Sequence, residues 1–332
     1  MPTKLVKRML AGDRFALAKL ITLVENRHPE TATVMSLIHG RCGRAYSIGI
    51  TGPPGAGKST LVDRLVGKLR ENNYSVGIIA IDPSSPFSGG AVLGDRIRMQ
   101  SHYLDEQVFI RSLSTRGSHG GLARATRNVA QLLDAFGKDF IVVETVGVGQ
   151  TELDVMRIAD TTVVVLVPEA GDTVQTMKAG LLEIADAFVV NKADRDGALR
   201  IKTELEMMLQ LRPATDWTVP VLLTEATTGK GVGELIEVIM RHREYWRSTG
   251  KGAVRSATAQ QEEFVAVLRE EISRRLETSL LDASLQNGEI GALLQQIKRG
   301  EIDPYRAALR IVDDERSMRA LLGKRGQKPA AE

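Results

Sequence analysis

Two short motifs, at residues 52–60 and 191–194, constrain the fold of this chain more than any other feature. Each directly follows an apolar run, residues 45–51 and 187–190, that is typical of a buried strand. The first motif consists of Gly52, Pro53, Pro54, Gly55, Ala56, Gly57, Lys58, Ser59 and Thr60. This is the pattern of a phosphate-binding loop, in which backbone N–H groups surround phosphates, the lysine reaches the β and γ oxygens, and a hydroxyl binds Mg²⁺.

The second motif, Asn191-Lys192-Ala193-Asp194, carries a carboxylate suited to reading a base. Asp194 can accept hydrogen bonds from both N1–H and the exocyclic amine of guanine. Adenine has no such pair of donors on that edge. Either motif alone could be a surface turn, but their order and their positions after strands predict a site for GTP and GDP rather than ATP.

Strand-like and helix-like segments alternate through the middle of the chain. The strand-like runs are rich in Ile and Val and are nearly continuous, as expected for strands covered on both faces. They lie at residues 45–51, 75–82, 108–114, 140–146, 161–168, 187–191 and 219–224, and helical patterns between them include residues 59–73, 122–136, 174–184 and 199–211. This order predicts an α/β phosphate-loop NTPase fold, with a doubly wound, mostly parallel sheet flanked by helices.

Helical segments flank this middle region on both sides, which predicts three domains. Residues 1–44 form an N-terminal helical extension, in which Asp13 can cap a helix whose apolar positions favour one face, namely Phe15, Leu17, Leu20, Ile21 and Val24. Residues 45–250 form the nucleotide-binding domain, and residues 251–332 form a C-terminal helical arm. In the arm we expect helices at residues 260–281 and 290–298, and a third that begins with Asp303 as its N-cap and Pro304 in its first turn. In that arm Phe264, Val267, Leu268, Ile272 and Leu276 make an apolar stripe, which could pack on its own domain or pair two subunits.

Composition excludes several classes of protein. The 44 basic and 41 acidic residues nearly cancel, so charge gives no argument for binding nucleic acid or an anionic membrane. One cysteine, Cys42, excludes an internal disulfide and a cysteine-based metal cluster. No run approaches the length of a membrane span, and residues 1–8 lack the apolar stretch of a secretory signal. These features predict a cytoplasmic protein.

Three carboxylates and a glycine follow strands at the edge where ligands of such sheets bind. Asp82 and Asp95 lie on the loop after the second strand, and Glu144 lies at the end of the fourth. All three are candidate ligands of Mg²⁺, directly or through water. Gly147 can offer a backbone N–H to the γ-phosphate, and a glycine at this position allows that N–H to change direction after the phosphate leaves. After the seventh strand, Ala226 is placed to donate its backbone N–H to the guanine carbonyl oxygen.

The residue after Gly147 is Val148, which cannot orient a water molecule for attack on the γ-phosphate. This predicts slow turnover of the isolated protein, with the missing group supplied by a partner or by a dimer contact. The candidates within the chain for stabilising the transition-state charge are Arg96, Arg98, Arg111 and Arg116, which the sequence does not rank.

The chain resembles the MeaB family of phosphate-loop GTPases, which includes the methylmalonic aciduria type A protein and proteins named ArgK. The resemblance covers most of residues 1–320 and rests on residues 52–60, 82–99, 114–121, 144–150, 168–178 and 191–194. It implies a Mg²⁺-dependent GTPase that serves an adenosylcobalamin-dependent methylmalonyl-CoA mutase by gating cofactor loading and protecting the mutase. It also implies that residues 82–99, 144–153 and 172–178 are switch segments, that Lys58, Asp82, Asp95, Glu144 and Gly147 are catalytic, and that the C-terminal helices form a homodimer.

Two other functions remain open from the residues alone. A GTPase that delivers a metal ion would need soft or imidazole ligands at short spacing, whereas the five histidines of this chain are scattered, at positions 28, 39, 102, 119 and 242. A phosphotransferase would need an acceptor base near the γ-phosphate, and no recognisable base of that kind is present in the sequence.

Overall fold

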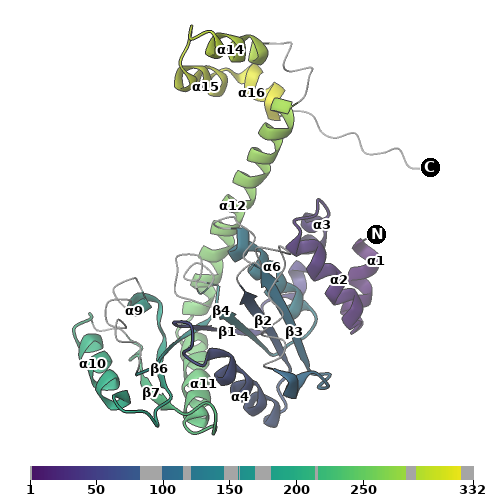
Figure 1. The fold of residues 1–332 in the computed structure, drawn as a ribbon. Helices are drawn as coiled ribbons and strands as arrows, with labels where there is room; N and C mark the ends of the chain where they lie inside the picture. The colour runs from purple at the N-terminus through teal and green to yellow at the C-terminus, as the bar shows by residue number, and fades with distance from the viewer. Residues whose placement is uncertain are drawn as a thin grey trace. The chain divides into compact units, whose positions relative to one another are not determined.

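The computed structural model describes residues 2–82, 99–114, 121–145, 156, 158–168, 181–213, 216–281 and 289–322. It confirms the predicted sheet, which has seven strands in the order β3-β2-β4-β1-β5-β6-β7, every adjacent pair parallel (Figure 1). The strands are β1 (Tyr46–Thr51), β2 (Val76–Asp82), β3 (Val108–Ser114), β4 (Phe140–Thr145), β5 (Thr161–Leu166), β6 (Ala187–Asn191) and β7 (Val221–Thr224). Chain order reverses at β1, between β4 and β5, which is where such sheets bind ligands.

Both faces of the sheet are buried under helices, and the middle of the central strands is therefore apolar on both faces. Along β4, Phe140 and Val142 join the core beneath α4 (Lys58–Glu71) and α11 (Val232–Ser248). The alternate residues Ile141 and Val143 join the core beneath α6 (Gly121–Ala135) and the N-terminal helices. A third core packs α9 (Leu181–Ile184) and α10 (Ala198–Gln210) on β5 and β6. The alternation of side chains explains why the strand runs are continuous in the sequence.

The N-terminal extension consists of α1 (Pro2–Leu10), α2 (Arg14–Glu25), α3 (Thr31–Ile38) and the short 3₁₀ helix η1 (His39–Arg41). The predicted cap of α2 is confirmed, because Asp13 Oδ1 accepts the N–H groups of Phe15 and Ala16. Phe15 itself does not join the apolar face: its side chain is 61% exposed, with Lys19 Nζ 4.6 Å from its ring centroid. Phe15 lies on the other side of α2 from the buried Leu17, Ile21 and Val24, so it faces away from the core.

Aspartates stabilise the amino ends of the strands, the edge opposite the phosphate loop. Asp139, just before β4, accepts the backbone N–H of Ser75 at 2.7 Å, and Asp160, just before β5, accepts that of Ser47 at 2.8 Å. Asp186, just before β6, accepts the N–H of Thr162 at 2.7 Å. Each carboxylate satisfies a donor at the start of the neighbouring strand, where the ladder has no partner for it.

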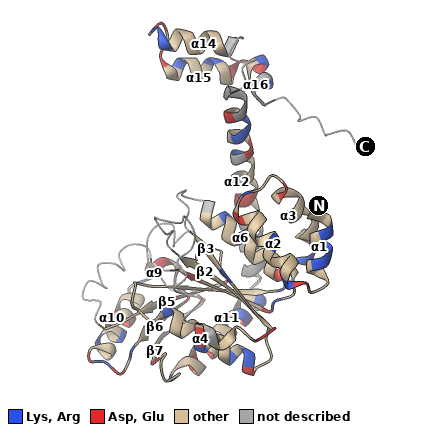
Figure 2. Cartoon of the chain, turned by 45° about the vertical axis from the view of Figure 1, so that its right-hand side comes forward, with Lys and Arg blue, Asp and Glu red and all other residues tan. Residues whose placement is uncertain are grey.

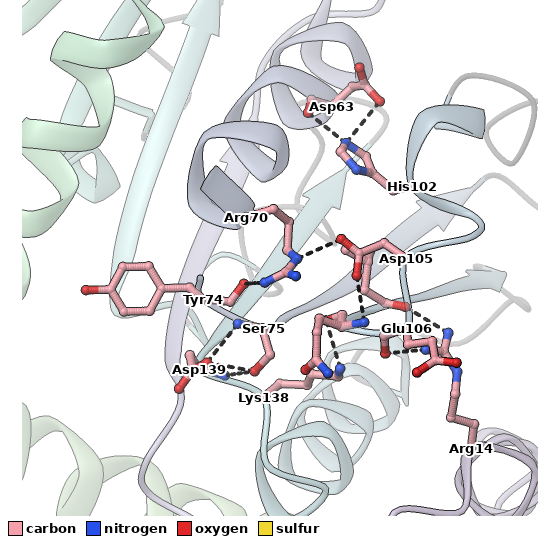
Figure 3. Close-up of polar contacts among 12 residues, drawn as sticks. Arg14, Asp63, Arg70, Tyr74, Ser75, His102, Asp105, Glu106, Lys138 and Asp139 are labelled. Carbon is pink, nitrogen blue, oxygen red and sulfur yellow. Dashed lines mark hydrogen bonds and ion pairs between the residues drawn. The ribbon is translucent and has the colours of Figure 1, made fainter. Parts of the chain in front are cut away.

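A polar network links the N-terminal extension to this edge (Figure 3). Arg14 donates to the carbonyls of Glu106 and Val108, which fixes α2 to the start of the edge strand β3. Lys138 is buried and donates to the Gln107 carbonyl at 2.8 Å. Arg70 on α4 pairs with Asp105 at 2.8 Å. On the other side of Asp105, η2 (Gln100–His102) places His102 Nε2 3.0 Å from the Asp63 carbonyl on α4.

The C-terminal region is helical, as predicted, with α12 (Lys251–Leu281), α14 (Glu289–Lys298), α15 (Pro304–Asp313) and α16 (Glu315–Leu322). Asp303 caps α15 and Pro304 occupies its first turn, as the sequence predicts. The helix α12 begins at Lys251, nine residues earlier than the predicted 260, directly after Gly250 ends the preceding helix with a φ of +66°. The chain divides into two compact units, Met1–Ala253 and Val254–Glu332. The predicted division into three domains stays a prediction.

Basic and acidic side chains are interspersed along the helices, as the balanced composition predicts (Figure 2). Within the described part of the chain, no helix is long and apolar enough to span a membrane.

Candidate functional site

The phosphate-binding loop follows β1 and crosses the end of β5 at very close range. Gly52 has a φ of +146°, and a Cβ built on it would lie 2.0 Å from the carbonyl oxygen of Val165. Only glycine fits there. The first glycine of the motif is therefore required by backbone packing as well as by the turn.

Lys58 begins α4 and turns back over the loop. Its Nζ donates to the carbonyls of Gly52 at 2.8 Å and Pro53 at 2.9 Å, which holds the ammonium group against the loop. The preceding residue, Gly57, has a φ of +84° and starts the helix, so that the first N–H groups of α4 face the loop. A helix amino end and a fixed ammonium group together make a site for phosphate.

Ser59 and Glu144 meet at the carboxyl ends of β1 and β4. Ser59 Oγ donates to Glu144 Oε1 at 2.6 Å, and both residues are buried. Next to them, Thr145 Oγ1 donates to Thr51 Oγ1 at 2.9 Å, which joins the two strand ends. A hydroxyl and a carboxylate are hard oxygen donors, the kind of ligand that Mg²⁺ prefers, so these residues fit the predicted metal site.

The other predicted Mg²⁺ and switch residues are only partly described. Asp82 is the last residue of β2, whose neighbour β4 carries Glu144 opposite Ala80. It therefore ends at the same sheet edge as Glu144. Predicted residues outside the described ranges are Asp95, Gly147, Val148, Arg96, Arg98 and Arg116. Arg111 bonds to Glu25 on α2 at 2.5 Å, so its guanidinium is engaged with the N-terminal extension.

Asn191 connects the phosphate loop to the loop after β7. Its Nδ2 donates to the Ala56 carbonyl at 2.8 Å, and its Oδ1 accepts both the Thr224 hydroxyl and the Ala226 N–H at 3.0 Å. The contact is tight, because a Cβ on Gly57 would lie 2.4 Å from Asn191 Nδ2. Buried amides of this kind are stable only when their donors and acceptors are paired. Asn191 therefore sets the position of both loops.

The loop after β7 is a compact turn of residues 225–230. Glu225 and Lys230 form an isolated antiparallel bridge, and the carbonyl of Glu225 also accepts the N–H groups of Thr228 and Gly229. The N–H of Ala226, predicted to face guanine, donates to Asn191 in this structure. A second contact comes from α4, where Arg64 donates to the carbonyls of Ala226 at 3.2 Å and Thr227 at 2.8 Å.

The charges near Asp194 lie on the surface. Lys230 Nζ is 2.7 Å from Glu225 Oε1. The hydrogen bond and charge of Glu225, followed by the charge of Asp194, raise the pKa of Lys230. Lys192, with a φ of +57°, turns the chain so that the exposed Asp194 stands beyond the end of β6. A cation thus accompanies the carboxylate predicted to read the base.

Three residues that shape this site are not predicted from the sequence: Val165, Thr224 and Arg64. Each acts through a partner far away in the chain. No local pattern could have marked Val165 or Arg64, because one is an ordinary strand residue and the other an ordinary helical arginine. Thr224 ends the predicted seventh strand, two residues before Ala226. Its nearness to Ala226 is the one feature of the sequence that could have marked it as part of the site.

Comparison with known proteins places this geometry in a family. Residues 17–280 match the family described as "Methylmalonyl Co-A mutase-associated GTPase MeaB". The chain belongs to the MeaB family of GTPases. A putative GTPase of Pyrococcus abyssi is 48% identical over 309 residues, which cover 92% of this chain and 94% of that protein. The mitochondrial methylmalonic aciduria type A homolog of Mus musculus is 31% identical and covers 92% of this chain and 77% of that protein.

A solved structure agrees with the MeaB assignment. The crystal structure of an LAO/AO transport system kinase matches with a TM-score of 0.64 and 28% identity, covering 94% of this chain and 96% of that one. The protein is therefore a phosphate-loop GTPase that binds guanine nucleotide and hydrolyses GTP to GDP and phosphate. The family membership predicted from residues 52–60, 144–150 and 191–194 is confirmed.

Proposed function

We propose that this GTPase is a chaperone of an adenosylcobalamin-dependent methylmalonyl-CoA mutase, gating cofactor loading and protecting the mutase. The observation that carries the proposal is the match of residues 17–280 to a family described as mutase-associated. A relative named for methylmalonic aciduria supports it. In this proposal hydrolysis of GTP times the release of the client.

The fold supports a coupling between nucleotide and client. The predicted switch segments follow β2, β4 and β5, and these strands end at Asp82, Thr145 and Leu166. All three ends lie at the edge of the parallel sheet that carries the phosphate loop. Segments attached there can respond to the loss of the γ-phosphate, because their anchor points adjoin it.

We also propose that Ser59 and Glu144, with Asp82 and Asp95, hold Mg²⁺. When bound, the ion would neutralise charge on the β and γ oxygens. Lys58 would provide a fixed positive charge from the opposite side of the loop. Hydrolysis should therefore stop when EDTA removes divalent cations and return when Mg²⁺ is added in excess. Turnover that continues in EDTA would contradict a Mg²⁺ requirement.

The direct test of the function is steady-state GTP hydrolysis with and without a purified cobalamin-dependent methylmalonyl-CoA mutase. We expect a slow basal rate, because Val148 cannot orient the attacking water, and a higher rate with the mutase. Lys58→Ala serves as the control, since loss of the ammonium group should abolish nucleotide retention and stimulation together. An unstimulated rate, with no complex on size-exclusion chromatography, would argue against this client while leaving the GTPase intact.

The two alternatives gain no support from the structure. A metal-delivering GTPase needs a cluster of ligands, and within the described part of the chain no three or more His, Cys, Asp or Glu side chains could hold an ion. A phosphotransferase needs an acceptor base beside the phosphate loop. The described residues around Lys58 and Ser59 instead bond to loop carbonyls and to Glu144.

A further inference from the structure

Arg64 ties the P-loop helix α4 to the turn at residues 225–230. Its Nε lies 3.2 Å from the Ala226 carbonyl and its Nη2 lies 2.8 Å from the Thr227 carbonyl. One rigid guanidinium thus holds two consecutive carbonyls. Arg64 belongs to neither nucleotide-binding motif, and the sequence separates it from the turn by more than a hundred and sixty residues.

This contact fixes the direction of a backbone N–H. The carbonyl of Ala226 and the N–H of Thr227 belong to one trans peptide unit, so they point in opposite directions. When Arg64 holds the carbonyl toward α4, the Thr227 N–H faces away from α4. The next peptide unit is fixed at both ends, because the Thr227 carbonyl bonds to Arg64 and the Thr228 N–H bonds to Glu225.

Asn191 holds the same turn from the other side. Its Oδ1 accepts the Ala226 N–H, and its Nδ2 holds the phosphate loop at Ala56. The turn is therefore attached to β6 through Asn191 and to α4 through Arg64. Two attachments from different elements fix its orientation, and Arg64 supplies the bond to the carbonyl of the peptide unit that joins residues 226 and 227.

We propose that Arg64 is a positioning residue for base selection, which fixes the backbone N–H of Thr227 toward the oxygen at position 6 of guanine. The inference rests on the proposed guanine site, in which Asn191 and Asp194 flank this turn. Thr227 takes the place predicted for Ala226, because the Ala226 N–H donates to Asn191. Guanine carries an acceptor at position 6, whereas adenine carries an amine there. A fixed N–H stabilises the first base and opposes the second, so the selectivity depends on how firmly the turn is held.

The test compares affinities for GTP, ITP and ATP, measured by displacement of a fluorescent GDP. ITP keeps the oxygen at position 6 and lacks the exocyclic amine that Asp194 reads. The variants are Arg64→Met, which removes the donors, and Arg64→Lys, which restores one. Arg200→Met is the control, since that arginine is exposed on α10 and, among the described residues, forms its ion pair with Glu204 of the same helix.

We expect Arg64→Met to weaken GTP and ITP in parallel, by about three- to tenfold for the loss of these hydrogen bonds. ATP affinity should not fall and should rise to the extent that the N–H opposed the adenine amine, so GTP-over-ATP selectivity falls by at least the same factor. Arg64→Lys should recover part of the selectivity, and Arg200→Met should equal the parent protein. Arg64 is exposed, so its replacement leaves the core intact.

Two results would overturn the inference. Equal weakening of all three nucleotides by Arg64→Met would mean that Arg64 supports the phosphate loop through α4 and does not act on base selection. Unchanged affinities would mean that Asn191 and the turn's own hydrogen bonds fix it without Arg64. A parent protein that does not prefer GTP over ATP would instead refute the guanine site itself, so the two failures are distinguishable.

Discussion

At the scale of single residues, Asn191 and Asp194 have different tasks although they share one motif. Asn191 is buried, and its side-chain amide bonds to the phosphate loop and to the loop after β7, whereas Asp194 is exposed beyond β6. The first is therefore a structural link, and the second is the carboxylate available to a base. Replacing Asn191 would disturb two loops, so Asp194 gives the cleaner test of base reading.

Asp194→Asn should shift the nucleotide preference of the protein from GTP to xanthosine triphosphate. The substitution replaces one acceptor oxygen by a donor, which opposes the guanine amine and suits the oxygen that xanthine carries at that position. Loss of a charged hydrogen bond predicts a fall in GTP affinity of about tenfold or more. Asp196→Asn, an exposed change in the same loop, is the control in the displacement assay. Unchanged guanine selectivity would assign base reading to another segment.

Lys138 predicts a pH dependence of stability. Burial, together with the nearby charges of Arg14 and Arg70, lowers its pKa from 10.5 to about 8. Below pH 8 the lysine is protonated in the folded and the unfolded chain, and the cost of burying its charge is present in full. Between pH 8 and 10.5 the folded chain releases the proton first. The contribution of Lys138 to stability therefore rises with pH, by about 3 kcal/mol across this interval.

Lys138→Met should remove this contribution to the pH profile. The Gln107 carbonyl keeps the N–H of Val76 as a partner, so the variant leaves no unsatisfied acceptor there. The parent should gain stability between pH 8 and pH 10.5, whereas the variant should not. The stability of the variant relative to the parent should therefore be highest near pH 7 and decrease toward pH 10.5. Urea denaturation at several pH values measures it, with the exposed Lys7→Met as control. A constant difference between variant and parent would contradict the effect of burial.

At the scale of elements, local sequence patterns predict the helices and strands of this fold well. They predict poorly which residues far apart in the chain contact one another. The strands and the cap of α2 can be predicted from the sequence, because a continuous apolar run and an N-cap aspartate are each signals contained within a few residues. The phosphate loop is equally local. The start of α12 is missed because Gly250 and Gly252 resemble a linker, although only the first glycine ends a helix.

The site shows the same limit. The sequence supplies Lys58, Ser59, Glu144 and Asn191 but not the contacts between them and their partners. The carbonyls that hold Lys58 lie within its own loop, whereas Glu144 and Arg64 reach their partners only after the sheet has formed. Side chains at the ends of parallel strands meet because the strands are neighbours in the sheet. The contacts can therefore be predicted only after the order of the strands is known.

Asp134 on α6 holds the segment that connects the N-terminal helices to β1. Its carboxylate accepts the backbone N–H groups of Gly43, Arg44 and Ala45, in the segment between the N-terminal helices and β1. Asp134 is 8% exposed, so its removal would leave several donors without an acceptor. We expect Asp134→Ala to destabilise the fold by about 3 kcal/mol.

Asp134→Asn should lose less, because one acceptor oxygen remains. Chemical denaturation measures both, with Glu71→Ala as the control, since Glu71 lies exposed on α4 in an ion pair with Lys68. If Asp134→Ala and Glu71→Ala have equal effects, the carboxylate does not anchor the segment.

At the scale of the whole molecule, α12 carries an apolar stripe on its surface. Phe264, Val267 and Leu268 are 65%, 37% and 47% exposed in the single chain. Residues on the other side of the helix, such as Glu262, Ser273 and Glu277, are polar and exposed. A helix with one exposed apolar side has a surface that a second copy can cover, which favours the proposal that the C-terminal helices form a homodimer.

Phe264→Glu should therefore convert a dimer into a monomer. In a two-fold interface the substitution places two charges in an apolar contact, which predicts a dissociation constant raised by about a hundredfold or more. Size-exclusion chromatography with light scattering measures the mass, and Ser273→Glu places the same charge on the polar side of α12 as a control. GTP affinity should not change, because the phosphate loop and Asn191 belong to the unit Met1–Ala253. Equal masses for Phe264→Glu and the parent protein would mean that the stripe does not join two subunits, and the apolar surface would then need a different partner.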